Sequence, residues 1–158
     1  MFGKYWYRSG INQTMRTELK GIVDSVTSVQ KLNEGDLWLD IACNDGTLLS
    51  FVPDGIKKLG IDPAEDSFKN ESSKIADEVI QDFFTLENFK KSKFKKKKAK
   101  VVTCIAMFYD LDDPNTFLED VCKCLDDQGI FIIQMMYMPF ALERNAFDGI
   151  CHEHLEYY

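Results

Sequence analysis

Acidic side chains stand at three places where the sequence predicts that buried strands end. Asp40 lies near the end of the apolar run DLWLDIA, Asp62 closes IKKLGID, and Asp82 follows the short run EVIQ. In an open parallel sheet, ligands bind beyond the carboxyl ends of the strands, so these positions are expected to meet around one site. The 22 residues between Asp40 and Asp62 approach the spacing at which a carboxylate binds the hydroxyls of a nucleoside ribose. There Asp82 would accept from an adenine amino group, and the ring of Phe83 would cover a purine face.

The loop after the first run reads DIACNDG, from Asp40 to Gly46. A nicotinamide or flavin dinucleotide needs a glycine-rich turn for its pyrophosphate, whereas this loop has one glycine and two carboxylates that would repel phosphate. Carboxylates would instead attract the sulfonium and the α-amino group of S-adenosylmethionine (SAM). Gly46, which lacks a Cβ, would let the backbone approach this ligand at the start of the next helix. The alternative is an Asp-Gly turn that only links strand to helix.

A second group of reactive side chains lies in the segment FDGICHEHLEYY, residues 147–158. His152 and His154, the two histidines of the chain, share one face of an extended segment, and Glu153 takes the other face. A metal site would need further ligands, such as Cys151 and a distant carboxylate, and no metal is predicted. The alternative is that both histidines are simply exposed to solvent.

The elements that must position these residues alternate between strand and helix. Asn12 is the expected cap of an amphipathic helix, and Met15, Leu19, Val23 and Val26 keep helical spacing within it. Strands are expected at residues 36–42, 56–62, 78–81, 100–107 and 129–136, and further helices at 47–52, 65–76 and 114–125. This order predicts an α/β fold with five parallel strands and helices on both faces. Residues 1–158 are expected to form one domain, which residues 1–34 enter through an aromatic segment and the amphipathic helix.

Composition narrows the class of protein and its partners. No apolar run is long enough to span a bilayer or to act as a secretory signal, and the five cysteines are scattered, so a cytoplasmic protein with reduced thiols is expected. Eight lysines fall within residues 90–100, which are predicted to be a solvated loop, and the rest of the chain carries 11 basic and 26 acidic residues. Neither nucleic acid nor membrane is therefore an expected partner.

Three segments resemble one family, the SAM-dependent sugar-nucleotide C-methyltransferases, which methylate a carbon beside the ketone of a nucleotide-linked 4-keto deoxysugar. They are YWYRSGINQTMRTEL, DIACNDGTLL and FDGICHEHLEYY. The resemblance implies a Rossmann-like class I methyltransferase sheet with SAM as cofactor and a nucleotide sugar as the small-molecule substrate. The cofactor contacts that it implies, together with those argued above, are Tyr7, Ser9, Asp40, Cys43, Asn44, Gly46, Asp62, Pro63, Asp82 and Phe83.

The same resemblance implies how the reaction would proceed. Methylating carbon requires an enolate, so a base must remove the proton beside the ketone. His154 would be that base, Glu153 would orient it or hold a substrate hydroxyl, and His152 would support it. Cys151 stands where part of the family has tyrosine, so it is left out of the catalytic set.

The resemblance also implies an incomplete sheet in the order 3-2-1-4-5, with strand five at an edge. Family methyltransferases have seven strands, and they add a zinc domain before and a further domain after this region. We therefore expect this chain to be the central part of a longer enzyme. Its exposed strand five would pair with another copy or with a complementary chain. Three other functions stay open: O- or N-methylation of a small molecule, a non-catalytic SAM-binding module, and nucleic-acid modification through the lysine run.

Overall fold

The computed structural model describes residues 6–147, 149–150 and 154–158 of this chain. The elements follow in the order η2 (Ser9–Ile11), α1 (Gln13–Val29), β1 (Leu37–Ile41), α2 (Thr47–Phe51), β2 (Lys57–Ile61), α3 (Asp66–Ser72), β3 (Glu78–Ile80), α4 (Leu86–Lys91), β4 (Ala99–Ile105), η3 (Phe108–Asp110), α5 (Pro114–Cys124), β5 (Leu125–Gln134) and α6 (Met138–Glu143). Asn12 caps α1 as predicted, because its side-chain oxygen accepts from the backbone N–H of Thr14 at 2.8 Å.

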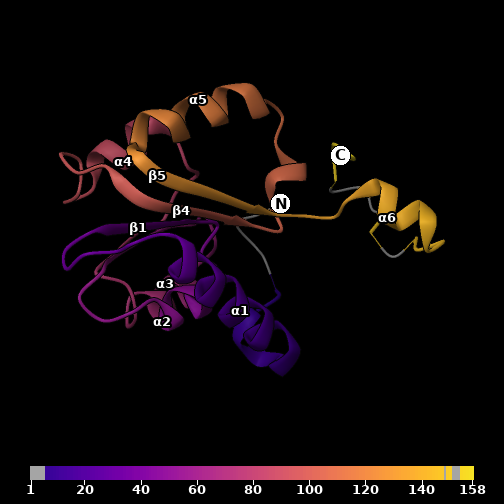
Figure 1. The fold of residues 1–158 in the computed structure, drawn as a ribbon, viewed down its shortest axis with the longest axis horizontal. Helices are drawn as coiled ribbons and strands as arrows, with labels where there is room; N and C mark the ends of the chain where they lie inside the picture. The colour runs from indigo at the N-terminus through magenta and orange to yellow at the C-terminus, as the bar shows by residue number, and fades with distance from the viewer. Residues whose placement is uncertain (1–5, 148, 151–153) are drawn as a thin grey trace.

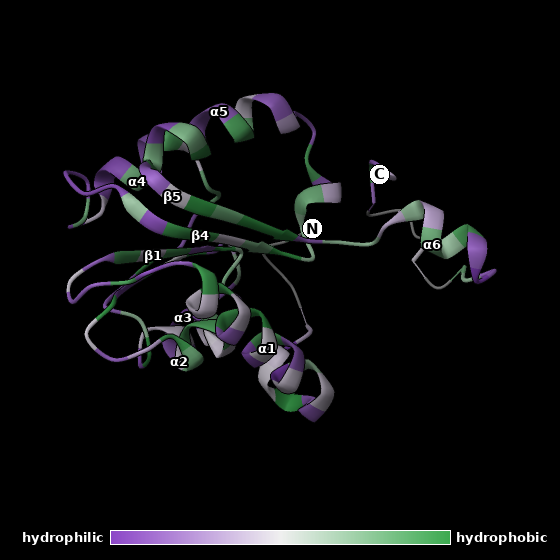
Figure 2. Ribbon diagram, viewed as in Figure 1, coloured by the Kyte–Doolittle hydropathy of each residue, from purple (hydrophilic) through white to green (hydrophobic). Residues whose placement is uncertain are grey.

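The five strands form one parallel sheet in the order β3-β2-β1-β4-β5, which confirms the predicted fold class and strand order. Helices cover both faces: α4 and α5 lie on one side of the sheet, and α1, α2 and α3 lie on the other (Figure 1). Every residue of β1 is buried, because the strand lies at the centre of the sheet between these two layers. Figure 2 shows hydrophobic residues along β1, β4 and β5, between the helical layers.

Alternate residues of β1 face two separate cores. Leu37, Leu39 and Ile41 pack with α5 on one side, while Trp38 packs against α1 and α2 on the other. Asp40 points to the same face as Trp38 and is the last buried polar residue before the strand ends. The period of the strand therefore aims this carboxylate at the end of the sheet on the α1 side.

The lysine run differs from the predicted solvated loop. It begins inside a helix, α4, that the sequence did not predict, and Phe94 in the middle of the run is buried in the core beneath α5. Residues 95–98 are exposed as expected, yet the ammonium of Lys97 donates to the carbonyl of Gly35 and that of Lys98 donates to the carbonyl of Lys123. Apolar side chains inside a charged run thus anchor it to the amino-terminal edge of the sheet.

Strand β5 also differs, since it starts at Leu125 rather than at the predicted residue 129. Leu125 pairs with Ala99, and the regular pairing then resumes only at Ile130 opposite Val101, so the residues between them form a bulge. A Cβ on Gly129 would meet the carbonyl oxygens of Asp126 and Ala99 at 2.9 Å and 3.0 Å. Glycine is required at this close approach, and its presence obscured the true start of the strand.

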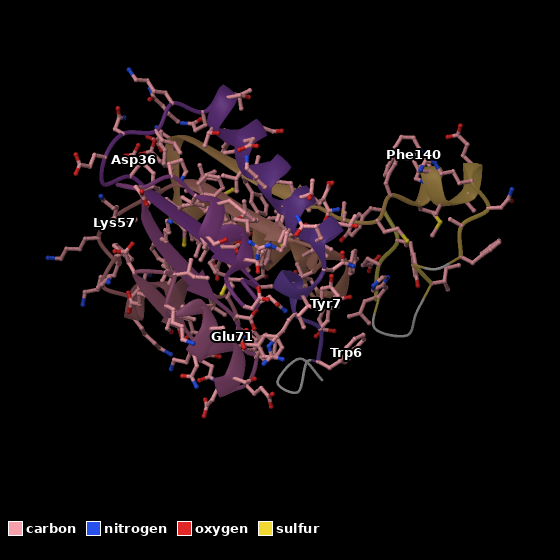
Figure 3. All side chains as sticks on the ribbon, turned by 90° about the horizontal axis from the view of Figure 1, so that it is seen from below. Trp6, Tyr7, Asp36, Lys57, Glu71 and Phe140 are labelled. Carbon is pink, nitrogen blue, oxygen red and sulfur yellow. The ribbon has the colours of Figure 1, made fainter. Side chains whose placement is uncertain are left out.

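The chain after β5 leaves the sheet. Helix α6 and the residues around it lie to one side of the α/β body, and Phe140 projects there well away from the sheet (Figures 1 and 3). Several large apolar side chains of this part are exposed: Tyr137, Phe140, Leu142, Phe147, Ile150, Leu155, Tyr157 and Tyr158. Among the helices of the described residues, none combines the length and hydrophobicity needed to cross a membrane.

Candidate functional site

A cavity of about 460 Å³ opens at the carboxyl ends of β1, β2 and β4. Its position is the one predicted for a ligand in a sheet whose strand order reverses between β1 and β4. The lining combines a few polar groups with a largely apolar wall, which suits a small organic ligand. Those lining residues are Tyr7, Ser9, Met15, Leu19, Asp40, Ile41, Ala42, Cys43, Asn44, Leu48, Ile61, Asp62, Pro63, Phe83, Phe84, Ile105, Ala106, Met107, Asp110, Leu111 and Asp112.

Asp40 is the most deeply buried carboxylate of this cavity, with 3% of its surface exposed. The hydroxyl of Thr103 in β4 donates to its Oδ1 at 2.6 Å. Burial raises the pKa of Asp40 to about 7, the Thr103 hydrogen bond opposes this rise, and the neighbouring charge of Asp62 adds to it. A cationic ligand would favour the ionised form of this carboxylate.

The loop after β1 follows an unusual backbone path. Ala42, Asn44 and Gly46 all have positive φ, at 60°, 51° and 80°. Asparagine and glycine tolerate this conformation, whereas alanine is strained in it. Ala42 lines the cavity, and strained backbone residues are often found at functional sites.

Gly46 has a packing role in the structure, and its predicted close approach to a ligand stays a prediction. It is not one of the described residues that line the cavity, and a Cβ there would lie 2.9 Å from Cα of Ser72 in α3. Glycine is therefore required because α3 packs against the start of α2. Cys43 and Gly60 show similar packing, since a Cβ on Gly60 would lie 2.5 Å from the Cys43 sulfur. Burial, with the charges of Asp40 and Asp62 nearby, raises the pKa of the Cys43 thiol well above its ordinary value.

A strap of residues 7–10 holds this loop from outside. Asn44 donates through Nδ2 to the carbonyl of Tyr7 at 2.9 Å and accepts at Oδ1 from the N–H of Ser9 at 3.1 Å. The N–H of Gly10 donates to Asp45 at 2.8 Å. Tyr7 and Ser9 line the cavity, and Tyr7 lies at the opposite end of the sheet from Asp36 and Lys57 (Figure 3).

Arg8 ties the same strap to α3. Its guanidinium donates from Nε to the Glu71 carboxylate at 3.2 Å and from Nη2 to the Ser67 hydroxyl at 2.9 Å. It also lies 4.3 Å from the ring centre of Phe68, a cation–π contact. The sequence indicated a role for this segment only through resemblance, because these partners lie about 60 residues away along the chain.

Asp62 lies at the end of β2 and lines the cavity beside Pro63. Its two oxygens accept from the backbone N–H groups of Asn44 and Ala64, each at 2.7 Å. Burial raises the pKa of this carboxyl, and the two backbone hydrogen bonds oppose the rise. A carboxylate has about four acceptor sites, so Asp62 retains capacity for ligand hydroxyls while it joins the two loops.

The residues after β3 divide between the cavity and solvent. Phe83 lines the cavity and is 56% exposed. Asn88 fixes its position by donating to the Phe83 carbonyl at 2.8 Å. Asp82 is exposed and is not among the described residues of the cavity wall; its Oδ1 accepts from the N–H of Phe83 at 2.8 Å. Its predicted contact with an adenine amino group stays a prediction.

His154 lies beside η3, the turn that follows β4. Its imidazole lies against the Tyr109 ring, with 4.0 Å between ring centres and 40° between the ring planes, and the Tyr109 carbonyl accepts from the N–H groups of Leu155 and Glu156. Nδ1 of His154 is buried, with no hydrogen-bond partner among the described residues. His154 itself does not line the described cavity, but Asp110 of the same turn does. His152 and Glu153 lie outside the described residues.

Residues 12–158 match the family described as a methyltransferase domain, which is nearly the whole chain. This chain belongs to the methyltransferase domain family. The C-methyltransferase NovU of Streptomyces niveus is 27% identical to it over 159 aligned positions, which take in all of this chain and 38% of NovU. The methyltransferase domain described here thus spans well under half the length of this curated relative.

Solved structures share the fold of this methyltransferase domain. The plantazolicin methyltransferase BpumL, in complex with a desmethylPZN analogue and SAH, superposes with a TM-score of 0.66 at 18% identity, over 91% of this chain and 55% of that one. DesVI of Streptomyces venezuelae gives a TM-score of 0.56 at 17% identity, over 77% of this chain and 51% of its own.

Sequence reasoning missed the part of the cavity that follows β4. Ala106, with φ of 53°, and its neighbours Met107 and Asp110 line the cavity. The available signal was the end of the apolar run KVVTCIAM, which should have been treated like the ends of the first three strands. The possible metal site has no counterpart in the described part of the chain, where no three metal-ligating side chains come together; His152 and Cys151 lie outside that part.

Proposed function

We propose that this methyltransferase domain binds SAM in the cavity and serves a C-methyltransferase that acts on a nucleotide-linked 4-keto deoxysugar. The observation that carries the proposal is the alignment of the entire chain with a relative named as a C-methyltransferase. The HEH segment, which lies within that alignment, supports methylation of carbon, because this reaction needs a base close to the methyl donor.

The chemistry of the cavity fits SAM better than a dinucleotide. Four aspartates line it, Asp40, Asp62, Asp110 and Asp112, so a pyrophosphate would be repelled there. The amino-acid end of SAM carries a positively charged sulfonium and an ammonium group, which these carboxylates would attract. Asp40 and Asn44 would hold that end.

The opposite end of SAM is a nucleoside, and the remaining polar and aromatic groups suit it. Asp62 would accept from the ribose hydroxyls through its free acceptor sites. Phe83 would cover the adenine with its exposed ring. Tyr7, Ser9 and Pro63 would close the cavity around these groups.

When bound, SAM supplies an electrophilic methyl group. The chain itself must provide an acceptor for the proton on the carbon beside the substrate ketone, and we assign this role to His154. Imidazole is suited to accept a proton at neutral pH. Its contact with Tyr109 would fix the ring plane, Glu153 would orient it or hold a substrate hydroxyl, and His152 would support it.

Two measurements test the proposal at separate steps. Calorimetry with S-adenosylhomocysteine (SAH) tests the cofactor site; the absence of any binding by the folded chain would overturn it. Deuterium uptake at the carbon beside the ketone of a nucleotide-linked 4-keto deoxysugar tests the base without requiring methyl transfer. Binding of SAH without this exchange would point instead to O- or N-methylation or to a non-catalytic module, and methyl-transfer assays with hydroxyl and amine acceptors would distinguish those two.

A further inference from the structure

Three buried polar groups connect the core to the cavity. The indole Nε1–H of Trp38 donates to Oγ1 of Thr103 at 3.1 Å, and the Thr103 hydroxyl donates to Oδ1 of Asp40 at 2.6 Å. Trp38 and Thr103 are fully buried, and Asp40 is nearly so. These hydrogen bonds connect two adjacent strands, since Thr103 of β4 pairs with Asp40 of β1.

The direction of these hydrogen bonds follows from the chemistry of the groups. An indole nitrogen only donates, so Oγ1 of Thr103 must accept from Trp38. A hydroxyl has a single hydrogen, and in this geometry it points to the nearest strong acceptor, Oδ1 of Asp40. This bond fixes the orientation of the Asp40 carboxyl group, which lines the cavity and keeps further acceptor sites for a ligand.

We infer that Thr103 is a positioning residue for the cofactor: oriented by Trp38, its hydroxyl holds the Asp40 carboxyl group in place, turned toward the amino-acid end of SAM. This inference rests on the proposed SAM site. It assigns a role in ligand binding to a core threonine that does not itself reach the cavity.

The groups that face Asp40 explain why it needs such support. Asp62 from the end of β2 is a second acid whose charge acts on it, and the thiols of Cys43 and Cys104 are buried nearby and feel its charge in turn. Burial of Asp40 favours its neutral form, and the Thr103 hydrogen bond is the contact that lowers its pKa. Without the hydroxyl, less of the carboxylate would be ionised near neutral pH.

The test is the pH dependence of SAH affinity, measured by calorimetry on the full chain and on Thr103→Val, which keeps the shape of the side chain and removes the hydroxyl. If loss of the hydrogen bond raises the pKa of Asp40 by about one unit, affinity should fall about fivefold at pH 7, because the ionised fraction falls by that factor. At pH 9 the variant should return to within about twofold of the wild type. Comparing the two proteins at the same pH removes the titration of SAH itself.

Matched variants keep the outcome clear. Thr103→Ser retains the hydroxyl and should follow the wild-type profile. Thr103→Val leaves the Trp38 N–H without an acceptor, which could unfold the protein. In that case the double variant Trp38→Phe/Thr103→Val, which removes both the N–H and the hydroxyl, is measured in place of the single variant. An equal loss of affinity at pH 7 and pH 9, or no loss at either, would overturn the role of Thr103. Failure of the wild type to bind SAH would instead refute the proposed SAM site.

Discussion

The imidazole of His154 lies against the phenol ring of Tyr109, with 4.0 Å between their centres. The two residues are 45 positions apart, and the backbone carbonyl of Tyr109 also accepts from the N–H groups of Leu155 and Glu156. Since Asp110 of the same turn lines the cavity, η3 carries the predicted base to the edge of the predicted cofactor site. We therefore expect the aromatic contact to set the orientation of His154.

Tyr109→Ala should slow deuterium uptake beside the substrate ketone by roughly tenfold to a hundredfold, because a misplaced base loses the benefit of orientation. Tyr109→Phe, which keeps the ring, should exchange at close to the wild-type rate. Proton NMR provides an independent readout, since the chain has two histidines and the His154 ring signals should shift only in the alanine variant. Equal exchange rates in both variants would show that Tyr109 does not position the base.

In an intact version of the enzyme, His154→Ala should abolish this exchange while SAH affinity changes by less than about twofold, because an interaction used only in the chemical step leaves binding intact. His152→Ala is the matched control and should retain measurable exchange if its role is only supporting. Persistence of the wild-type exchange rate without His154 would assign the base to another residue.

Asp62→Ala should weaken SAH binding by about a hundredfold, because two hydrogen bonds from ribose to a carboxylate would be lost. The carboxylate also joins Asn44 to Ala64, so the loop conformation must be checked by circular dichroism and thermal unfolding. Asp62→Asn keeps one acceptor oxygen, so its SAH affinity should lie between those of the wild type and Asp62→Ala. Unchanged affinity in the alanine variant would place the ribose elsewhere.

Asp40→Asn should stabilise the ligand-free domain by an amount that grows with pH. The pKa of Asp40 is raised from 3.8 to about 7 on folding, so the folded wild type holds a proton that the unfolded chain releases, and its stability falls as pH rises through this window. The advantage of asparagine should increase by up to about 1.4 kcal/mol per pH unit between pH 4 and 7 and level off above pH 7. Urea unfolding at pH 5, 6, 7 and 8.5 measures this difference. A difference independent of pH would mean that folding does not raise the pKa of Asp40.

The edge of β5 should promote association between copies of the chain. β5 lies at the end of the five-stranded sheet, and its exposed backbone groups are available for pairing. Sedimentation velocity should show mass increasing with concentration, and amides of β5 should become protected from hydrogen exchange as it does so. Phe140→Asp in α6 is the control, because it changes an exposed apolar side chain away from the sheet. Association abolished by that change alone would assign the contact to α6.

Local sequence was sufficient to predict the α/β fold and the place of the cavity, while the strand order came from the family resemblance. Apolar runs such as the one containing Asp40 predict buried parallel strands. Carboxylates at the ends of two such strands could be expected to lie close together, because the carboxyl ends of parallel strands share one edge of the sheet. The helix cap at Asn12 could also be predicted, since its capping contacts span only two or three residues.

Only the tertiary structure decided what supports these groups. It assigned Gly46 to packing against Ser72, and it brought the residue 7–10 strap onto Asn44. It also placed the hydroxyl of Thr103 on Asp40, a contact between positions 63 residues apart. Such contacts depend on how strands and helices pack across the sheet. A short-range pattern along the chain therefore does not predict which distant residue will contact a given side chain.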